Sequence, residues 1–377
     1  MKISNIKAEP DRVETTDNTS LNIQLYGKNN DYPQKLKQVT AASGTAISCI
    51  STYAKFIQGG GFSDPAFYRM KVNSAGLTND QLLSFVSKDI ADFKGFSLHF
   101  NYNVLGEITD INFVPFEHCR MVLEDQNGRV EKIAVHRDWT KRKRLTTINS
   151  TTIQYIDKFN PIPEVVRHQI QACGGIEQYK GQILWYSFDG EGVYPKPLYD
   201  SVITDISTEA GISNVLYRNV RYNFLPAGAF IRKKGKTVQN IDENGKEIPD
   251  DFPAQFKRFQ GDENANKIID IEVDFEEEEP KFIPFVVEKR GDEFKTTDEI
   301  IRSKIGRVFL QPPILRAESV ATGFTTEAMQ DAYKYYNSIT TSERFELERI
   351  FTRIFENWHD QTVNPSKSLA ITPLQYV

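Results

Sequence analysis

The sequence predicts an α+β protein built from more than one structural unit. Three patterns support this prediction. Apolar residues recur at helical intervals as far as about residue 93, alternate with a period of two from Phe96 to about Trp185, and then follow one long helical stripe after Pro197. Helices followed by strands, within a segment of about 160 residues, are typical of an α+β domain.

The first helix is expected between a turn and a glycine run. Pro33 opens it, apolar positions continue to Ile57, and a break is possible at Ser43-Gly44. Gly59-Gly60-Gly61 ends it and lacks the spacing of a dinucleotide-binding glycine loop. We therefore interpret the three glycines as a helix stop and a flexible link.

A second helix and a set of strands follow. Thr78 and Gln81 fit a capping box, and Gly95 is expected to stop the helix that they begin. Residues 97–102 alternate in polarity, and Asn127-Gly128 lies between two short strand-like runs, which indicates a hairpin.

The helix after Pro197 is the longest expected element. Its apolar positions recur every three or four residues for roughly 25 residues, about 38 Å at the usual rise per residue. The narrow apolar stripe favours a helix with neighbours on more than one side, as in a bundle or ring. The charged segment 229–287 follows, with strand-like runs at 268–273 and 282–287.

Three further helices are expected towards the end of the chain. Capping signals at Thr296–Glu299 and Thr340–Glu343 begin two of them, and helical spacing after Thr326 indicates the third. Pro312-Pro313 ends the first of these helices. The segment 314–325 has small side chains and no clear period, which predicts a loop.

The composition excludes several classes of protein. The chain has 377 residues, of which 51 are acidic and 46 basic, and its net charge is −5. No apolar stretch approaches the roughly 18 residues of a membrane span, and the N-terminal residues lack the apolar region of a signal peptide. Cys49, Cys119 and Cys173 are too few and too widely spaced for a disulfide framework. We expect a soluble protein made in a reducing cytoplasm, with no membrane partner.

Charge is unevenly distributed along the chain. Residues 242–299 hold 19 acidic and 8 basic side chains, including the run Glu276, Glu277, Glu278 and Glu279. Two basic clusters precede that segment: Lys141, Arg142, Lys143 and Arg144, and then Arg232, Lys233, Lys234 and Lys236. Such runs are usually solvated surface, and a surface that faces a polyanion is the alternative.

No motif marks a catalytic or metal site. Gly235-Lys236-Thr237 resembles the end of a phosphate-binding loop, but Phe230 stands where the first glycine is required. The five histidines do not fall at metal-ligand spacings, and no nucleophile-elbow motif occurs. We predict no cofactor, metal or catalytic residue. A hydrolase with a carboxylate pair stays open as an alternative, because sequence does not show how far apart two carboxylates lie in space.

The order of several short segments resembles that of tailed-bacteriophage portal proteins. These segments are Asn29-Asn30-Asp31-Tyr32-Pro33 with Leu36, Ser48-Cys49-Ile50, 57–62, 190–198 before the long helix, 223–228 after it, 256–264 with Lys267-Ile268, and 309–313. The resemblance covers about residues 29–358, and the order and spacing of the segments carry it. The chain is short for this family, which implies a minimal crown.

The resemblance implies a portal-type fold. Such a fold has an α+β wing, two long stem helices, an α/β clip insertion, a tunnel loop and a short helical C-terminal crown region. The corresponding segments are an N-terminal arm (1–28), the wing (29–194), the first stem helix (195–223), the clip (224–287), the second stem helix (288–313), the tunnel loop (314–326), the C-terminal helices at the base of the wing or crown (327–360) and a tail (361–377).

The resemblance also implies a function. Portal proteins form a ring, usually of twelve subunits, at one capsid vertex, and double-stranded DNA is packaged and ejected through it. The expected partners are further copies of the chain, the major capsid protein, the terminase large subunit, the head–tail adaptor and non-specific double-stranded DNA. The expected location is the virion, after assembly in the host bacterial cytoplasm. The chain itself would not be an enzyme, because the terminase hydrolyses ATP; another virion protein, such as an adaptor, is an alternative.

Candidate contact residues follow from this resemblance. The tunnel-loop residues expected at the DNA channel are Arg316, Glu318, Ser319, Val320, Ala321, Thr322 and Gly323. Small and sparsely charged side chains suit a conduit, because each basic contact with a phosphate adds affinity for the passing duplex. The basic residues 232–236 and the acidic run 276–279 would contact terminase or adaptor. The basic cluster 141–144 would face capsid protein or DNA.

Overall fold

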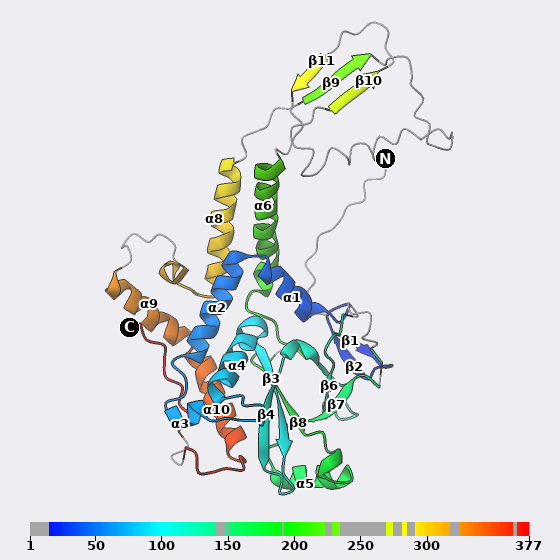
Figure 1. Ribbon diagram of the computed structural model, residues 1–377, viewed down its shortest axis with the longest axis vertical. Helices are drawn as coiled ribbons and strands as arrows, with labels where there is room; N and C mark the ends of the chain where they lie inside the picture. The colour runs from blue at the N-terminus through cyan, green and yellow to red at the C-terminus, as the bar shows by residue number, and fades with distance from the viewer. Residues whose placement is uncertain are drawn as a thin grey trace, which may run out of the picture. The chain divides into compact units, whose positions relative to one another are not determined.

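Two units make up the part of the chain that the structure describes (Figure 1). In this computed structural model the described residues are 15–140, 148–149, 151–190, 192–222, 228–233, 269–273, 281–284, 291–316, 325–364 and 368–376. The first unit comprises Met1–Ser207 and Arg302–Val377, and the second comprises Thr208–Ile301. The chain is therefore α+β, with one unit inserted into the other.

A six-stranded mixed sheet forms the centre of the first unit. Its strands are β3 (Gly95–Tyr102), β4 (Ile108–Val114), β5 (Cys119–Met121), β6 (Lys132–Val135), β7 (Gln154–Lys158) and β8 (Gln182–Ser187), arranged in the order β4-β3-β8-β7-β6-β5. The hairpin predicted around Asn127-Gly128 is confirmed as the antiparallel pair β5 and β6. Only β7 and β8 run parallel in this sheet. A parallel pair needs a crossover connection, and the connection contains α5 (Pro163–Ala172).

The sequence prediction missed α5, because the whole stretch from residue 96 to 185 was expected to form strands. Pro163 occupies its first turn, where the missing N–H is not needed. Val166 and Ile170 are buried four residues apart, on one face of the helix. These are ordinary helix signals, and the alternating strands on both sides obscured them.

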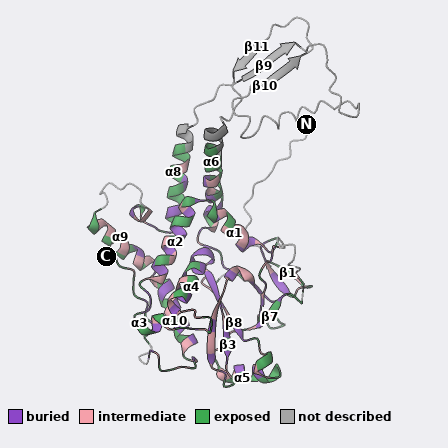
Figure 2. Cartoon of the chain, viewed as in Figure 1, coloured by how far each residue is buried: buried purple, intermediate pink, exposed green. Residues whose placement is uncertain are grey.

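Further helices pack around the sheet and against one another in this unit, and α4 lies against the sheet. They are α1 (Tyr32–Ala41), α2 (Gly44–Gln58), α3 (Pro65–Arg69), α4 (Asn79–Phe93), α9 (Thr326–Ile339) and α10 (Thr341–Phe355). The α4 helix packs against α2 and β3 (Figure 1). Figure 2 shows α4 and β3 as mostly buried. The predicted break between α1 and α2 is confirmed at Ser43, whose hydroxyl caps α2 by accepting a 3.0 Å hydrogen bond from the amide of Ala46.

The end of α4 differs from the prediction. Its capping box at Thr78 and Gln81 is confirmed, but Lys94 takes the left-handed conformation at the C-terminus, with φ 59°. Gly95 instead begins β3 and lies against the ring of Phe116, so that a Cβ there would come within 2.8 Å of the ring. Gly95 is therefore a packing glycine rather than a helix stop.

The three glycines after α2 also have a different role from the one predicted. They end the helix as expected, but they do not form a free link, because the C-terminal segment lies along them. The amide of Gly60 donates to the carbonyl oxygen of Thr372 at 2.7 Å, and the amide of Thr372 donates to the carbonyl oxygen of Gly61 at 2.9 Å. A Cβ at Gly59 would collide with the carbonyl oxygen of Thr372. Only glycine permits this close approach of two backbones.

The N-terminal segment is more ordered than its polar sequence indicated. Residues 15–28 of the expected arm include the hairpin of β1 (Thr15–Asn18) and β2 (Ile23–Tyr26). Ile23 also bridges to Val122, next to β5. Ile23 and Tyr26 are fully buried. This part of the chain therefore belongs to the core of the first unit.

Two of the remaining helices, α6 and α8, begin at residues other than those predicted, whereas α10 begins after Thr340 as expected. The 3-10 turn η3 (Asp200–Val202) precedes α6 (Ile203–Tyr222), which is 20 residues long. The α8 helix (Gly291–Val308) begins five residues before Thr296, so the capping box predicted there is wrong. The capping box predicted at Thr340 is also wrong: no side-chain cap forms at α10, because the Glu343 carboxylate binds Lys94 and Tyr53 instead.

A small mixed sheet belongs to the second unit. Its strands are β9 (Gly228–Lys233), β10 (Ile269–Val273) and β11 (Lys281–Pro284). The central strand β9 pairs in parallel with β10 and antiparallel with β11. The two strand-like runs predicted in the charged insertion are confirmed as β10 and β11.

Candidate functional site

The start of α6 is fixed by residues that lie far apart in the sequence. Tyr26 stacks on Tyr194 with the ring centroids 4.0 Å apart, and its hydroxyl donates to the carbonyl oxygen of Pro195 at 2.9 Å. The Tyr32 hydroxyl donates a 2.7 Å hydrogen bond to the carboxylate of Asp200, in the turn before α6. Two of the segments that resemble portal proteins, around Tyr32 and around Tyr194, therefore meet in space at the beginning of the long helix.

Arg120 completes this cluster from β5. Its side chain is fully buried, and its Nε and Nη2 donate to the side-chain and backbone oxygens of Asn30 at 2.5 and 2.8 Å. Its Nη1 donates to the carbonyl oxygens of Glu117 and Cys119. The guanidinium also lies 5.1 Å from the ring centroid of Trp139, within the range of a cation–π contact. We call Tyr26, Tyr32, Arg120 and Tyr194 the tyrosine–arginine cluster.

The first turn of α6 lies beside the last turns of α8. Lys304 and Asp205 form a 3.0 Å salt bridge between the two helices. Tyr199 precedes α6, Phe309 follows α8, and their rings are stacked with centroids 6.1 Å apart. The Tyr199 hydroxyl donates to the carbonyl oxygen of Asp92 at 2.7 Å. The salt bridge and the stacked rings therefore join α6, where it leaves the first unit, to α8, where it returns to that unit.

A buried ion pair connects the surrounding helices. The Lys94 ammonium lies 2.8 Å from the Glu343 carboxylate, which also accepts a 2.6 Å hydrogen bond from the hydroxyl of Tyr53. Burial opposes ionisation of Glu343, but the Lys94 charge and the hydrogen bonds from Lys94, Tyr53 and Ser342 outweigh it, so the pKa of this carboxyl lies below its usual value. The pair joins α4, α2 and α10 beneath the junction of α6 and α8.

The C-terminus of α8 has an unusual residue in a common motif. The amide of Gln311 donates to the carbonyl oxygen of Gly306, and the amide of Leu310 to that of Arg307, at 3.1 and 3.0 Å. These are the two hydrogen bonds of a Schellman motif, whose left-handed position is usually glycine. Here that position is Leu310, with φ 51° and a side chain that is 52% exposed.

A hollow opens beside this motif in the first unit. Its volume is about 370 Å³, and it is lined by Ser303, Arg307, Leu310, Gln311, Pro312, Pro313, Arg316 and Tyr335. Arg316 reaches back across α8, donates from Nη1 to the carbonyl oxygen of Gln311 at 3.0 Å, and lies over Gly306, where a side chain would collide with the guanidinium. We call this the α8 hollow.

Three of the residues predicted from the portal resemblance are described by the structure. Arg316 ends the 3-10 turn η5 (Pro313–Arg316) and lines the α8 hollow. Arg232 and Lys233 end β9, where they are paired in register with Glu272 and Val273 of β10. The other predicted residues lie outside the described residues: Glu318, Ser319, Val320, Ala321, Thr322, Gly323, Lys234, Lys236, Glu276, Glu277, Glu278, Glu279, Lys141, Arg142, Lys143 and Arg144.

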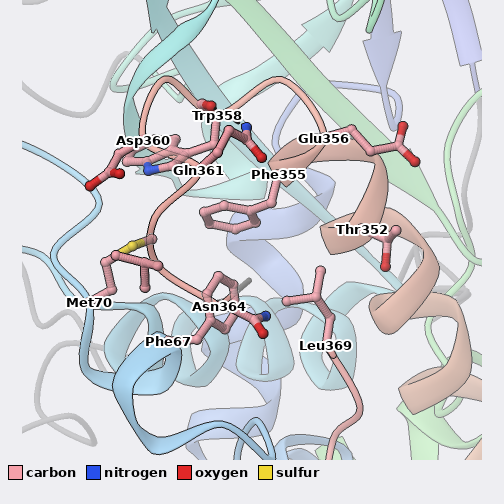
Figure 3. Close-up of a pocket in the computed structure, with 11 residues that line it drawn as sticks. Phe67, Met70, Thr352, Phe355, Glu356, Trp358, Asp360, Gln361, Asn364 and Leu369 are labelled. Atoms are coloured by element: carbon pink, nitrogen blue, oxygen red, sulfur yellow. Dashed lines mark hydrogen bonds between the residues drawn. The ribbon is translucent and has the colours of Figure 1, made fainter. Parts of the chain in front are cut away.

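A second cavity, of about 100 Å³, lies between α3, the end of α10 and the C-terminal segment (Figure 3). Phe67, Met70 and Phe355 supply apolar surface, and two carboxylates, Glu356 and Asp360, lie at its edge. Figure 3 shows both carboxylates directed away from the ring of Phe355. Hydrogen bonds from Thr362 hold the pKa of Asp360 below its usual value, so this carboxyl is ionised rather than poised as a general acid. The cavity therefore does not favour the hydrolase alternative.

Two carboxyl groups with raised pKa values lie away from both cavities. Burial raises the pKa of Asp89 to about 7 and that of Asp92 to about 6, but both carboxyls are buried on α4 and line neither cavity described above. Within the described ranges, no three His, Cys, Asp or Glu side chains are placed to hold a metal ion. Nor does any described helix have the length and apolar character needed to cross a membrane.

Comparisons with solved structures identify proteins of the same fold. No protein-family model matches the chain, and no curated protein matches it. A chain in the neck of the native gene transfer agent particle, computed with C12 symmetry, aligns with a TM-score of 0.55 at 13% identity, over 88% of this chain and 82% of that chain. A chain in the virion of the native particle gives 0.53 at 14% identity, over 89% and 85%. An HK97-family phage portal protein from Corynebacterium diphtheriae gives only 0.41 at 8% identity, over 80% and 85%.

The first two matches show that the fold is shared with chains of a virion and its neck. This finding concerns the fold alone, and it agrees with the resemblance that the sequence indicated. Sequence reasoning did not find Gln311, Leu310 or the pair of Asp205 and Lys304, because their importance depends on contacts formed only after folding. The one available signal was Leu310-Gln311-Pro312-Pro313, a helix end without a glycine.

Proposed function

We propose that this chain is a portal subunit, and that copies of it form a ring at one vertex of a phage-like capsid through which double-stranded DNA passes. The observation that carries the proposal is the insertion between α6 and α8. These helices leave and re-enter the α+β unit side by side at Asp205 and Lys304, and the segment between them forms a separate unit with its own small sheet. The shared fold of gene transfer agent neck and virion chains supports it.

In this proposal each part has a role. The α6 and α8 helices are the two stem helices, residues 224–287 are the clip, residues 314–326 are the tunnel loop, and residues 327–360 form the base of the crown. The narrow apolar stripe of α6 suits a helix that packs against equivalent helices of neighbouring subunits. A small ring-shaped assembly also agrees with the C12 and C6 symmetry in which the similar neck particles were computed. The ring would number about twelve subunits, would be structural rather than enzymatic, and would need no cofactor.

Each proposed partner would bind a different surface of the subunit. The clip, including Arg232 and Lys233 at the end of β9, would bind terminase during packaging and the head–tail adaptor afterwards. The basic cluster 141–144 would face the major capsid protein or DNA outside the ring. The tunnel loop would face non-specific double-stranded DNA in the channel. Assembly would take place in the cytoplasm of a host bacterium, before the ring becomes part of the virion.

The direct test is the native mass of the purified chain at low and high salt, with electron micrographs of the same fraction. We expect rings with a central hole. A 43.2 kDa monomer at every concentration, with and without scaffold and capsid proteins, would contradict the proposal.

A second test concerns the channel. Deleting residues 319–323 should leave the rings intact and impair DNA packaging, because the proposed tunnel loop would be shortened without loss of the stem. Normal packaging by rings with this deletion would refute the assignment of the tunnel loop.

A third test concerns the clip. We expect that the isolated fragment 224–287 will not unfold cooperatively, because a charged segment of this length has little core of its own and would need neighbouring subunits to complete it. A sharp thermal transition of the monomeric fragment would contradict this role.

A further inference from the structure

The α8 hollow is the larger of the two cavities described above, and its lining is positively charged. Its volume of about 370 Å³ lies within the range of about 300–1,000 Å³ that is usual for small-molecule sites. Arg307 and Arg316 line it, and no carboxylate of a described residue does. Arg307 is exposed and forms no salt bridge with any described residue. The charge of the hollow therefore favours an anionic ligand.

The end of α8 is arranged so that it does not oppose an anion. A helix C-terminus is normally a poor place for one, because its free carbonyl oxygens form the negative pole of the helix. Here the carbonyl oxygens of Gly306 and Arg307 accept the two amide hydrogen bonds of the Schellman motif. Arg316 lies over Gly306, where any side chain would collide with its guanidinium. Gly306 therefore allows a second positive charge to lie on the helix end, beside the hollow.

Hydroxyl groups from two helices complete the polar lining. Ser303 precedes Arg307 by four residues, so both lie on the same face of α8. Tyr335 comes from α9, and 48% of its surface is exposed. The carboxylate one turn before it on α9, that of Asp331, is paired with Lys334 at 3.3 Å. The lining thus combines hydrogen-bond donors for an anion with the surface of an aromatic ring.

This lining matches an anion that also carries a flat apolar group. Guanidinium groups bind phosphate through paired hydrogen bonds, and serine and tyrosine hydroxyls also donate to phosphate oxygens. Apolar surface lies beside the arginines, from Leu310, Pro312, Pro313 and Tyr335. Nucleobases stack on aromatic side chains whatever the base. An inorganic phosphate ion or an acidic peptide would use the arginines and leave the ring uncovered, whereas a nucleotide uses both.

We infer that the α8 hollow is a nucleotide-binding site, in which Arg307 and Arg316 bind the phosphate and Tyr335 stacks on the base. The Ser303 hydroxyl donates to a phosphate oxygen. The proposed function concerns a duplex that passes without being held, whereas this site retains a single nucleotide. All the lining residues belong to one subunit, so the inference does not depend on ring formation.

The experiment measures binding of adenosine 5′-monophosphate to the full-length chain by equilibrium dialysis. We expect one site per chain, with an affinity about tenfold or more above that for adenosine or inorganic phosphate. Arg307→Gln should lower the affinity for the nucleotide about tenfold or more and remove most of its salt dependence. Tyr335→Ala should lower it about fivefold or more and leave binding of inorganic phosphate unchanged.

Matched controls show that the effects are local to the hollow. Arg349→Gln and Tyr376→Ala change exposed residues of the same types that do not line the hollow, and they should bind the nucleotide like the wild type. Urea denaturation of each chain confirms that it is folded. Equal losses of affinity in the control chains would overturn the inference.

Two competitors identify the source of the nucleotide. Free mononucleotides and the 5′ end of a single strand present the same phosphate and base, and both agree with the inference. Displacement of the bound nucleotide by a 5′-phosphorylated single-stranded oligonucleotide assigns the site to strand ends, and no displacement assigns it to free nucleotides. Displacement by a blunt duplex without terminal phosphates would assign the hollow to the DNA backbone and overturn the inference.

The remaining outcomes overturn the inference and leave the portal proposal standing. They are equal affinity of the wild-type and Arg307→Gln chains for the nucleotide, equal affinity for the nucleotide and inorganic phosphate, and tighter binding of a hexaglutamate peptide than of the nucleotide. The last result would assign the hollow to an acidic protein segment. Absence of rings contradicts the portal proposal alone, because the dialysis measurement is made on the chain in either state.

Discussion

The tyrosine–arginine cluster and the α8 hollow lie at the two ends of the same inserted segment, and they differ in whether their polar groups have hydrogen-bond partners within the subunit. In the cluster, Arg120 makes hydrogen bonds from all three of its guanidinium nitrogens, and Tyr26 and Tyr194 donate to backbone carbonyls. At the hollow, the side-chain amide of Gln311 has no partner among the described residues, and Leu310 occupies a position that suits glycine.

The difference shows which of the two regions is stabilised by contacts within a single subunit. Where every polar group is paired inside the subunit, a substitution breaks existing interactions, and stability should fall. Where groups are strained or unpaired, a substitution relieves a cost, and the stability of the isolated subunit should rise or stay constant. Of the four predictions that follow, those for Arg120 and Leu310 test this comparison directly, and those for Gly59 and Asp89 extend it to other buried positions of the first unit.

The largest effect is expected for Arg120→Met. This change removes the four hydrogen bonds that the buried guanidinium donates, each worth about 0.5–1.5 kcal/mol. Asn30 Oδ1 keeps its hydrogen bond from the Tyr26 amide, and the Glu117 carbonyl oxygen keeps the one from Gln34. We expect the free energy of unfolding to fall by about 3 kcal/mol or more, as measured by urea denaturation of the monomeric chain. Arg349→Met, at a side chain that is 75% exposed, should change it by less than about 0.5 kcal/mol. A loss below about 1 kcal/mol for Arg120→Met would contradict the expected difference between the two regions.

Gly59→Ala is expected to have the next largest effect. The new Cβ would collide with the backbone of Thr372 and would stand on a residue with φ 59°. We expect a loss of about 2–3 kcal/mol and release of the C-terminal segment, detected as faster proteolysis within residues 368–376. Gly76→Ala, also at positive φ but with open space around it, separates backbone strain from the collision. Equal proteolysis of the two variants would count against the docking role.

Asp89→Asn should change how stability depends on pH. Burial raises the pKa of Asp89 to about 7, against 3.8 for an ordinary aspartate, so the folded state keeps a proton that the unfolded state loses between about pH 4 and 7. Stability therefore falls as the pH rises through this range. Asparagine cannot ionise, so the variant should be about 1–2 kcal/mol more stable at pH 8 and should lose less stability between pH 4 and 7. Denaturation at several pH values, with Asp331→Asn as an exposed control, measures this; an unchanged slope would contradict it.

Leu310→Gly should have the smallest effect on the free energy of unfolding. It should raise this free energy, whereas Arg120→Met should lower it. Glycine adopts φ 51° without the Cβ strain of leucine, so the isolated subunit should gain about 1 kcal/mol. The control Leu105→Gly removes a similarly exposed side chain, 62% exposed, from a residue without positive φ, and should give no gain. A loss of stability at Leu310 would show that its side chain already packs within the subunit.

Local signals in the sequence predicted the fold where they were strong. Ser43 and the pair Thr78 and Gln81 mark helix starts that the structure confirms, because a capping side chain and its backbone donor are only a few residues apart. Thr340 and Glu343 have the same spacing but form no capping box, because Lys94, about 250 residues away, binds the Glu343 carboxylate. A tertiary ion pair outweighed a local cap that is worth about 1 kcal/mol.

The candidate contact sites were harder to predict than the fold. Arg316 stays a prediction as a channel residue, and the structure adds its contact with Gly306 at the α8 hollow. The importance of Gln311 could not be inferred from sequence, because an unpaired amide is defined by the absence of partners in three dimensions. The charge clusters at 141–144 and 276–279 stay predictions, since they lie outside the described residues.

The contact between Thr372 and the glycines after α2 has a consequence for how the chain folds during synthesis. Its two partners are 311 residues apart, and the whole inserted unit is translated between them. Contacts of such long sequence separation form late and slow folding. The end of α2 therefore stays uncovered on the ribosome until residues 368–376 emerge, and a chain arrested before that point presents an open backbone edge to chaperones.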